Sequence, residues 1–193
     1  MRRRTFDTLM ATGGLVMTLV LLVAGALLFV GYDFANSNVE DNLKAQNIFF
    51  PKADNPQMED PRIGPFIKQY AGQQVVTGAQ AEAYANHYIA VHLEDVNEGK
   101  TYAETSTQSR ANPDNAELSA AVQTLFRGET LRGLLLNAYA FWKLGQIALL
   151  ASVAAFATAA LMGLLTVLGF WHRTRVPADQ EILAPPIKMA QAV

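Results

Sequence analysis

Cysteine is absent from this chain of 193 residues, and charged side chains are absent from two long stretches of it. The lack of cysteine excludes disulfide bonds, thiolate metal sites and cysteine nucleophiles. The charge-free stretches cover residues 8–32 and 144–171, and neither contains Asp, Glu, Lys, Arg or His. Both exceed the roughly 20 apolar residues that cross the hydrocarbon core of a bilayer. The sequence therefore predicts two transmembrane helices.

Two other interpretations of the first stretch are a buried helix of a soluble protein and a cleaved export signal. Between Leu9 and Tyr32 there are 12 Leu, Val and Phe residues, which favour membrane insertion by about 4–7 kcal/mol in total. The arginines at 2–4 resemble the basic start of a signal. The apolar core of a signal is usually only about 7–15 residues long, so we expect an uncleaved anchor.

The charge distribution predicts the orientation of the two helices. Basic residues beside membrane helices remain in the cytoplasm, and they flank the outer ends of both stretches, at 2–4 and at 173 and 175. The segment between the stretches carries 9 Lys and Arg against 14 Asp and Glu, a net charge of −5. We expect a cytoplasmic N-terminus (1–7), a first span (8–32), an extracytoplasmic domain (33–143), a second span (144–171) and a disordered cytoplasmic tail (172–193).

The extracytoplasmic domain is expected to be mostly helical, so that the fold class is an all-α membrane protein. Residues 33–46 read as a polar continuation of the first helix, and four prolines predict a loop over residues 51–65. A second helix is predicted from Thr77 to about Glu98, with Gly99 as its end. A third is predicted from Asn112 as its N-cap, with Pro113 in its first turn, and it continues towards the second span.

Small residues form a ladder along the second span at intervals of four, and the first span carries a sparser set. Small side chains let helix backbones approach closely in a membrane. The ladder predicts a packing face, either for the chain's own first span or for a partner protein or second copy docking on the second span. The residues of this predicted helix-packing interface are Ala151, Ala155, Ala159 and Gly163, with Gly14, Thr18 and Gly25.

Two of the three histidines, His87 and His92, stand five residues apart beside acidic residues. On an α-helix they would point about 140° apart, whereas a helical metal pair needs a spacing of three or four. We therefore interpret the segment as a helix whose Tyr84, Tyr88 and Val91 pack inward. The sequence contains no nucleophile elbow, phosphate-binding loop or zinc-protease motif. We expect no catalytic residues, no metal, no cofactor and no nucleic-acid partner.

Four segments resemble a group of small two-pass membrane proteins of actinobacteria. They are "RRRTFDTLMATGGLVMTLVLLVAGALL", "GYDFANSNVEDNL", "VVTGAQAEAYANHYIAVHL" and "TLFRGETLRGLLLNAYAFWKLGQIA". The resemblance implies the two-pass topology. Some members are labelled aromatic ring-opening dioxygenases, which implies non-haem iron held by two histidines and a carboxylate. The available histidines are His87, His92 and His172.

These observations predict a non-enzymatic, multi-pass protein of the cell (inner) membrane. It would act as an accessory or scaffold subunit that docks on a membrane partner, through the small-residue ladder and the outer domain. An extracytoplasmic ligand-binding or sensing module is the first alternative, and a solvent-accessible pocket in the outer domain would favour it. A non-haem iron dioxygenase is the second alternative.

Overall fold

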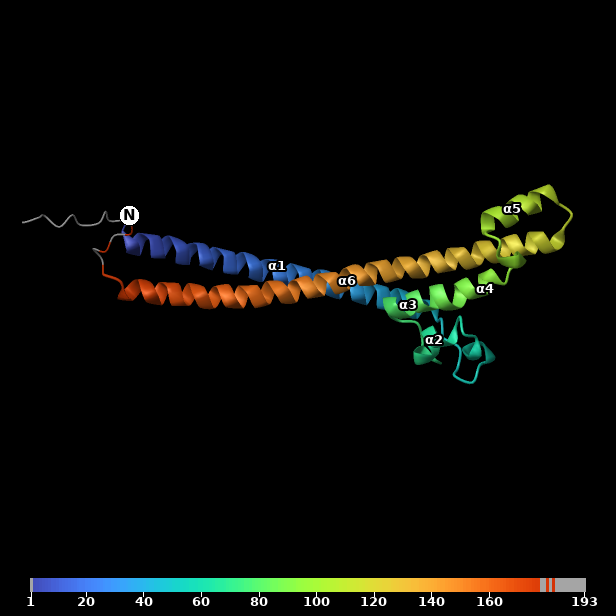
Figure 1. Cartoon of the computed structure of the whole chain (residues 1–193), viewed down its shortest axis with the longest axis horizontal. Helices are drawn as coiled ribbons and strands as arrows, with labels where there is room; N and C mark the ends of the chain where they lie inside the picture. The colour runs from blue at the N-terminus through green and yellow to red at the C-terminus, as the bar shows by residue number, and fades with distance from the viewer. Residues whose placement is uncertain (1, 178–179, 181, 183–193) are drawn as a thin grey trace, which may run out of the picture. The chain divides into compact units, whose positions relative to one another are not determined.

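The computed structural model describes residues 2–177, 180 and 182, and within them every named element is a helix (Figure 1). The all-α class and the two long apolar helices are therefore confirmed. The elements are α1 (Arg3–Gln46), η1 (Pro56–Glu59), α2 (Gly64–Ile67), η2 (Lys68–Tyr70), α3 (Gly78–Tyr84), η3 (Ala85–Ile89), α4 (Ala90–Glu94), η4 (Asn97–Gly99), α5 (Tyr102–Ala111) and α6 (Ala116–Arg175).

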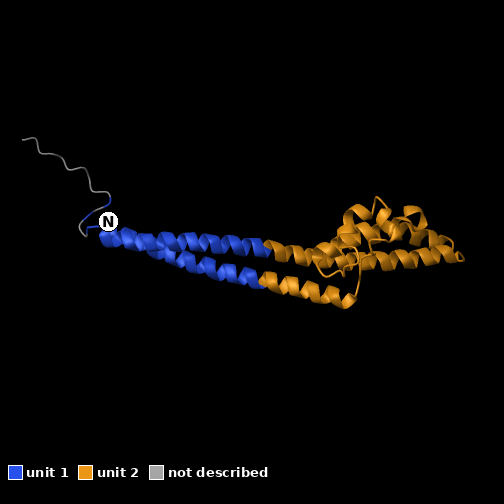
Figure 2. Ribbon diagram, turned by 90° about the horizontal axis from the view of Figure 1, so that it is seen from below, with its two compact units in different colours: residues 1–30, 148–193 blue, residues 31–147 orange. Residues whose placement is uncertain are grey.

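The chain forms two compact units (Figure 2). Unit 1 comprises residues 1–30 and 148–193, and unit 2 comprises residues 31–147. Helix α1 continues without a break from the first apolar stretch into the polar residues 33–46, as predicted. It ends where Asn47 adopts a φ of 54°, a left-handed conformation that asparagine tolerates at a helix end.

In unit 1, the first part of α1 and the last part of α6 run antiparallel and side by side. A Cβ placed on Gly169 would lie 3.5 Å from the Cβ of Ala11, and one on Gly163 would lie 3.5 Å from Cγ2 of Thr18. Further along, the Ser152 hydroxyl donates a buried 2.8 Å hydrogen bond to the carbonyl of Gly25. Small side chains thus bring the two backbones close together.

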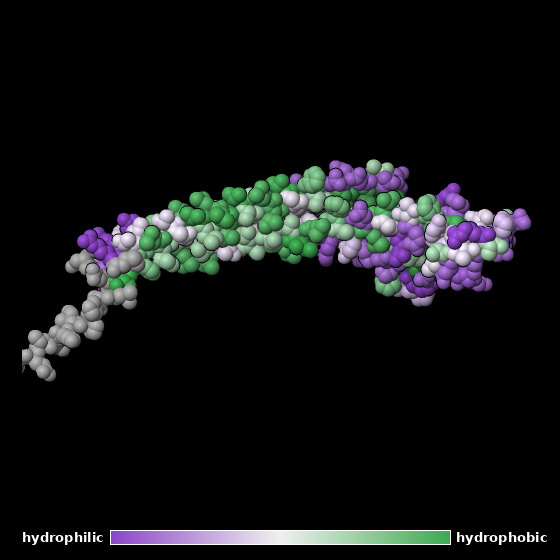
Figure 3. All heavy atoms as spheres, turned by 90° about the horizontal axis from the view of Figure 1, so that it is seen from above, coloured by the Kyte–Doolittle hydropathy of each residue, from purple (hydrophilic) through white to green (hydrophobic). Residues whose placement is uncertain are grey.

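The long helices of unit 1 expose many large apolar side chains, and the face seen in Figure 3 is largely apolar apart from its hydrophilic end. Both long helices are apolar enough over 18 residues to cross a membrane, yet only 6% of that window is buried in α1 and 11% in α6. A buried core helix of a soluble protein would show the opposite pattern. The structure therefore leaves an extensive apolar surface that residues 2–177, 180 and 182 do not cover.

Unit 2 has its own hydrophobic core, built from α1, the loop after it, α3, α4 and the first half of α6. Phe50 anchors the core: its ring contacts the rings of Tyr70 and Tyr84 at centroid distances of 5.2 and 5.3 Å. Burial raises the pKa of Tyr84 to about 12. The buried members of the core are Val39, Leu43, Phe50, Met58, Ile63, Ile67, Val75, Ala81, Ala83, Ala85, Ile89, Val91, Leu93, Leu125 and Leu135.

The helix predicted from Thr77 starts where expected. The Thr77 hydroxyl accepts from the backbone N–H of Gln80, and the Gln80 side chain accepts from the N–H of Thr77, which forms a capping box. The helical run contains the π-turn η3 and ends at Glu94 rather than Glu98. Gly99, at φ 75°, closes the separate short helix η4.

The predicted helix start at Asn112 is wrong. Asn112 instead ends α5, a helix that the prediction lacked and that starts with a capping box between Thr101 and Glu104. The N-cap of α6 is Asn115, whose side chain accepts from the N–H of Leu118 at 3.0 Å. Pro113 therefore lies in the turn between the two helices, where its fixed φ and missing N–H disturb no helical hydrogen bond.

The predicted loop over residues 51–65 is only partly irregular, because it contains η1 and the first residues of α2. Asn55 caps η1 by accepting from the N–H of Gln57 at 2.9 Å. Helix α6 reaches Arg175, three residues beyond His172. Most of the tail that was predicted to be disordered, residues 172–193, lies outside the described residues.

Candidate functional site

The predicted helix-packing interface lies largely where α1 and α6 meet in unit 1. Ala159 is 1% exposed, and Gly25 is buried as well. Ala155 and Gly163 are half-buried, as are Gly14 and Thr18. A Cβ on Gly25 would lie 3.0 Å from the ring of Phe156. The chain's own two helices therefore use this face.

Ala151 does not belong to the interface, because its side chain is exposed. Within unit 1, the buried positions of α6 are Ser152, Ala159 and Thr166, which repeat every seven residues rather than every four. Seven residues turn the helix by about 700°, which leaves each position roughly 20° from the last, whereas Ala151 lies about 80° from Ala159. A seven-residue repeat keeps one face towards a partner helix, as in a coiled coil.

Ser152 also lies on this face and forms an interhelical contact, although the four-residue ladder did not include it. Its interhelical hydrogen bond to Gly25 is fully buried, which in an apolar environment leaves neither group unpaired. The seven-residue spacing from Ser152 to Thr166 was the available signal. Since Ala159 contacts α1, replacing it would disturb the chain's own helix pair before it disturbed any partner.

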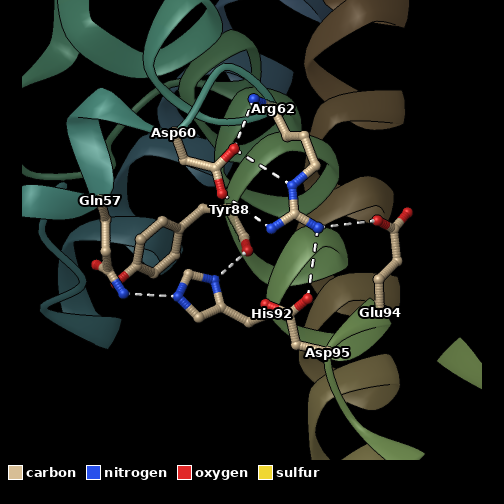
Figure 4. Close-up of polar contacts among 7 residues, drawn as sticks. All are labelled: Gln57, Asp60, Arg62, Tyr88, His92, Glu94 and Asp95. Carbon is tan, nitrogen blue, oxygen red and sulfur yellow. Dashed lines mark hydrogen bonds and ion pairs between the residues drawn. The ribbon is translucent and has the colours of Figure 1, made fainter. Parts of the chain in front are cut away.

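The segment that contains His87 and His92 belongs to unit 2, where His92 takes part in a closed polar network (Figure 4). His92 Nδ1 lies 2.6 Å from the carbonyl of Tyr88, so this nitrogen carries the proton. His92 Nε2 then accepts from the Gln57 amide at 2.7 Å, and the Tyr88 hydroxyl donates to Oε1 of Gln57 at 2.9 Å. The network ties η1 to the helix formed by η3 and α4.

Arg62 forms a second set of contacts beside this network (Figure 4). Its guanidinium pairs with Asp60 at 2.9 Å and with Asp95 and Glu94 at 3.4 and 3.7 Å. Hydrogen bonding to Arg62 lowers the pKa of the Asp60 carboxyl, and Asp60 and Asp95 raise the pKa of Arg62. Arg62, Glu94 and Asp95 are exposed and Asp60 is half-buried, so the cluster positions the loop on α4 more than it stabilises the fold.

These contacts do not fit the iron site that the family resemblance implies. The ring of His87 stacks on Phe66 at 3.8 Å and 5°, while both ring nitrogens of His92 already have partners. His172 belongs to the other unit. Within the described residues, no three His, Asp or Glu side chains gather as metal ligands would. As predicted, Val91 is buried, and Tyr84 and Tyr88 are half-buried and pack against the core of unit 2.

Among the hollows of unit 2 are two of different character. The first, of 190 Å³, is an apolar groove between α1 and α6; its lining residues are Asn42, Leu43, Gln46, Ile48, Leu131, Leu134, Leu135 and Ala138. The second, of 160 Å³, is lined by charges of both signs, including Lys100, Glu129 and Arg132. The Arg132 Nε–H is buried and has no hydrogen-bond partner in the part of the chain that the structure describes. The groove suits an apolar partner, and the charged hollow suits a small polar ligand.

Neither hollow nor network could be anticipated from the sequence, because their members come from distant segments. Gln57 and His92, for example, lie 35 positions apart. Comparison with protein-family models, with curated proteins and with solved structures finds no match to this chain.

Proposed function

We propose that this chain is a two-pass protein of the cell (inner) membrane that acts as a non-enzymatic accessory or scaffold subunit. The observation that carries the proposal is the exposed apolar surface of unit 1. In water that surface would forgo about 25 cal/mol of stabilisation for each Å² that burial would provide. In a bilayer the same surface contacts lipid at no such cost.

The proposed orientation places both termini in the cytoplasm and residues 33–143 outside. The basic residues at 2–4 and at 173 and 175 support it, because basic segments beside membrane helices resist translocation. The acidic middle segment carries no comparable basic cluster. Residues 8–32 and 144–171 form the two spans.

Labelling of single cysteines tests this orientation, and the cysteine-free chain makes each label unique. We expect a cysteine at Thr107, an exposed position on α5, to react with a membrane-impermeant maleimide in intact cells. A cysteine at Thr174, at the end of α6, should react only after the membranes are opened. The control is a permeant maleimide, which should label both. Labelling of Thr174→Cys in intact cells would refute the orientation.

Docking is proposed to occur at the apolar groove of unit 2 rather than at the small-residue ladder, which α1 and α6 occupy themselves. Leu134 is 63% exposed at this groove, and Leu131 is also exposed. Large exposed apolar side chains next to a groove are typical of contact surfaces. The partner is another membrane protein or a second copy of the chain.

A photo-crosslinking amino acid at Leu134 tests this docking face. We expect it to yield one discrete adduct in intact membranes, because the partner's side chains would fill the groove. The same amino acid at Ala140, an exposed position of α6 outside the groove, should yield none. Leu131→Asp should reduce the Leu134 adduct at least tenfold, since a charge in an apolar contact lacks a partner. An adduct of twice the chain mass would identify a second copy; no adduct, or an equal one at Ala140, would refute this face.

Ligand sensing is the second candidate function, and the charged hollow of unit 2 is the observation that favours it. The unpartnered Nε–H of Arg132 is a donor that a small anionic or zwitterionic ligand would satisfy. Sensing would require ligand-dependent stabilisation of unit 2, which distinguishes it from scaffolding.

A further inference from the structure

A cleft of 290 Å³ opens between α1 and α6 in unit 1, close to the ends of the helices that carry the basic residues. Its polar lining residues are Asp7, Thr166 and His172. Its walls are apolar and include Met10 and Leu165, which are 62% and 53% exposed. The cleft therefore has polar groups in its lining and apolar walls. On the proposed function, these walls face lipid.

Two polar atoms of this cleft are buried without a hydrogen-bond partner among the described residues. One is Oδ2 of Asp7 and the other is the hydroxyl of Thr166, whose side chain is only 6% exposed. Thr18 and Thr158, on the same two helices, donate to the carbonyl four residues earlier. Thr166 makes no such bond, so its hydroxyl is available to a molecule in the cleft.

The neighbouring cations do not neutralise Asp7. The Nε of Arg4 donates to the carbonyl of Val176 at 2.8 Å, and an Nη of Arg3 lies 3.5 Å from Nε2 of His172. Asp7 thus lacks an ion pair among the described residues, and a carboxylate beside hydrocarbon is costly without a partner. A ligand with an N–H donor would supply one.

We propose that this cleft binds the headgroup of a phospholipid that carries a primary ammonium group. The ammonium would donate to Asp7 and to the Thr166 hydroxyl, the two cleft groups that lack a partner among the described residues. The acyl chains would follow the apolar walls at Met10 and Leu165. The inference rests on the proposed membrane location, but not on the docking function.

Native mass spectrometry of the full chain in mild detergent tests this assignment. The chain is offered equal amounts of phosphatidylethanolamine, phosphatidylcholine and phosphatidylglycerol with the same acyl chains. We expect phosphatidylethanolamine to be retained preferentially, because the choline nitrogen has no N–H and the glycerol headgroup has no positive charge. Asp7→Asn should reduce this preference about tenfold, the expected effect of one charge-assisted hydrogen bond.

Two further variants test whether the lipid preference depends on groups in the cleft or on any loss of a polar side chain. Thr166→Val keeps the shape of the side chain and should reduce the preference about threefold, since it removes one neutral hydrogen bond. Asp33→Asn, an equivalent change at an exposed position of α1, should leave it unchanged. Equal retention of the three lipids, preference for phosphatidylglycerol, or an unaltered preference in Asp7→Asn would overturn the assignment. Recovery of the parent chain in the soluble fraction would instead refute the membrane location itself.

Discussion

Cysteines introduced at Ala11 and Gly169 are expected to form an intramolecular disulfide in nearly every molecule after mild oxidation. A Cβ on Gly169 would lie 3.5 Å from that of Ala11, within the roughly 3.5–4.5 Å that a disulfide requires. The bond would close a loop of about 159 residues. Because this lowers the entropy of the unfolded chain, we expect the folded state to be stabilised by about 5 kcal/mol. Gel mobility without reductant and thermal unfolding in detergent measure the two effects.

The matched control for this disulfide is Thr12→Cys combined with Gly169→Cys. Thr12 is the next residue of α1 and is exposed, since it lies about 100° around the helix from Ala11. We expect little intramolecular bond in the control. A disulfide between two chains in the Ala11 pair would show that the helices of unit 1 pair between copies, which contradicts the packing described above.

Two arginines in the middle of the first span are expected to prevent it from crossing the membrane. Leu19 and Val23 are exposed on α1, and each arginine near the centre of a span costs about 2.5–3.5 kcal/mol. The total of about 5–7 kcal/mol is as large as the apolar gain estimated for this span. In Leu19→Arg/Val23→Arg, maleimide labelling of a cysteine at Thr107 from outside should fall at least tenfold.

The control places the two arginines at Asp41 and Ala45 instead. Both positions are also exposed on α1 but belong to unit 2. In water an arginine on a helix surface has no insertion cost, so labelling at Thr107 should remain at the parent level. If labelling is undiminished with arginines at 19 and 23, this stretch does not need to be apolar. That result would contradict the proposal that residues 8–32 cross the membrane.

The small-residue ladder serves the packing of the chain's own two helices and is not the proposed docking face. The ladder was expected to mark either the chain's own packing or a partner's face. Ala159 is buried on the same face of α6 as Ser152, which donates to Gly25 of α1. The partner is therefore sought at unit 2, where Leu134 is exposed beside a groove. This assignment separates the residues that hold the chain together from those that are available to another protein.

Several local features could be predicted because their signals lie within a few residues. The start of α3 follows from Thr77 and Gln80, which satisfy each other's backbone groups. Helix α5 had an equally local signal, the pair Thr101 and Glu104, which the prediction overlooked. The π-turn η3 had none, because its i→i+5 hydrogen bonds depend on packing around Ala85 and Ile89, which are both buried.

The sequence by itself determined that the chain is helical and that two stretches are apolar enough to cross a membrane. Both properties depend on residue types and their short-range spacing. The transfer free energies of the side chains and the capping of helix ends can be read from these without knowledge of the fold. Only the tertiary structure decided that Ser152, and not Ala151, contacts α1, and that Gln57 meets His92. Small side chains surround the second span on several sides, so its packing face depends on a helix more than 100 positions away, and no local pattern contains that information.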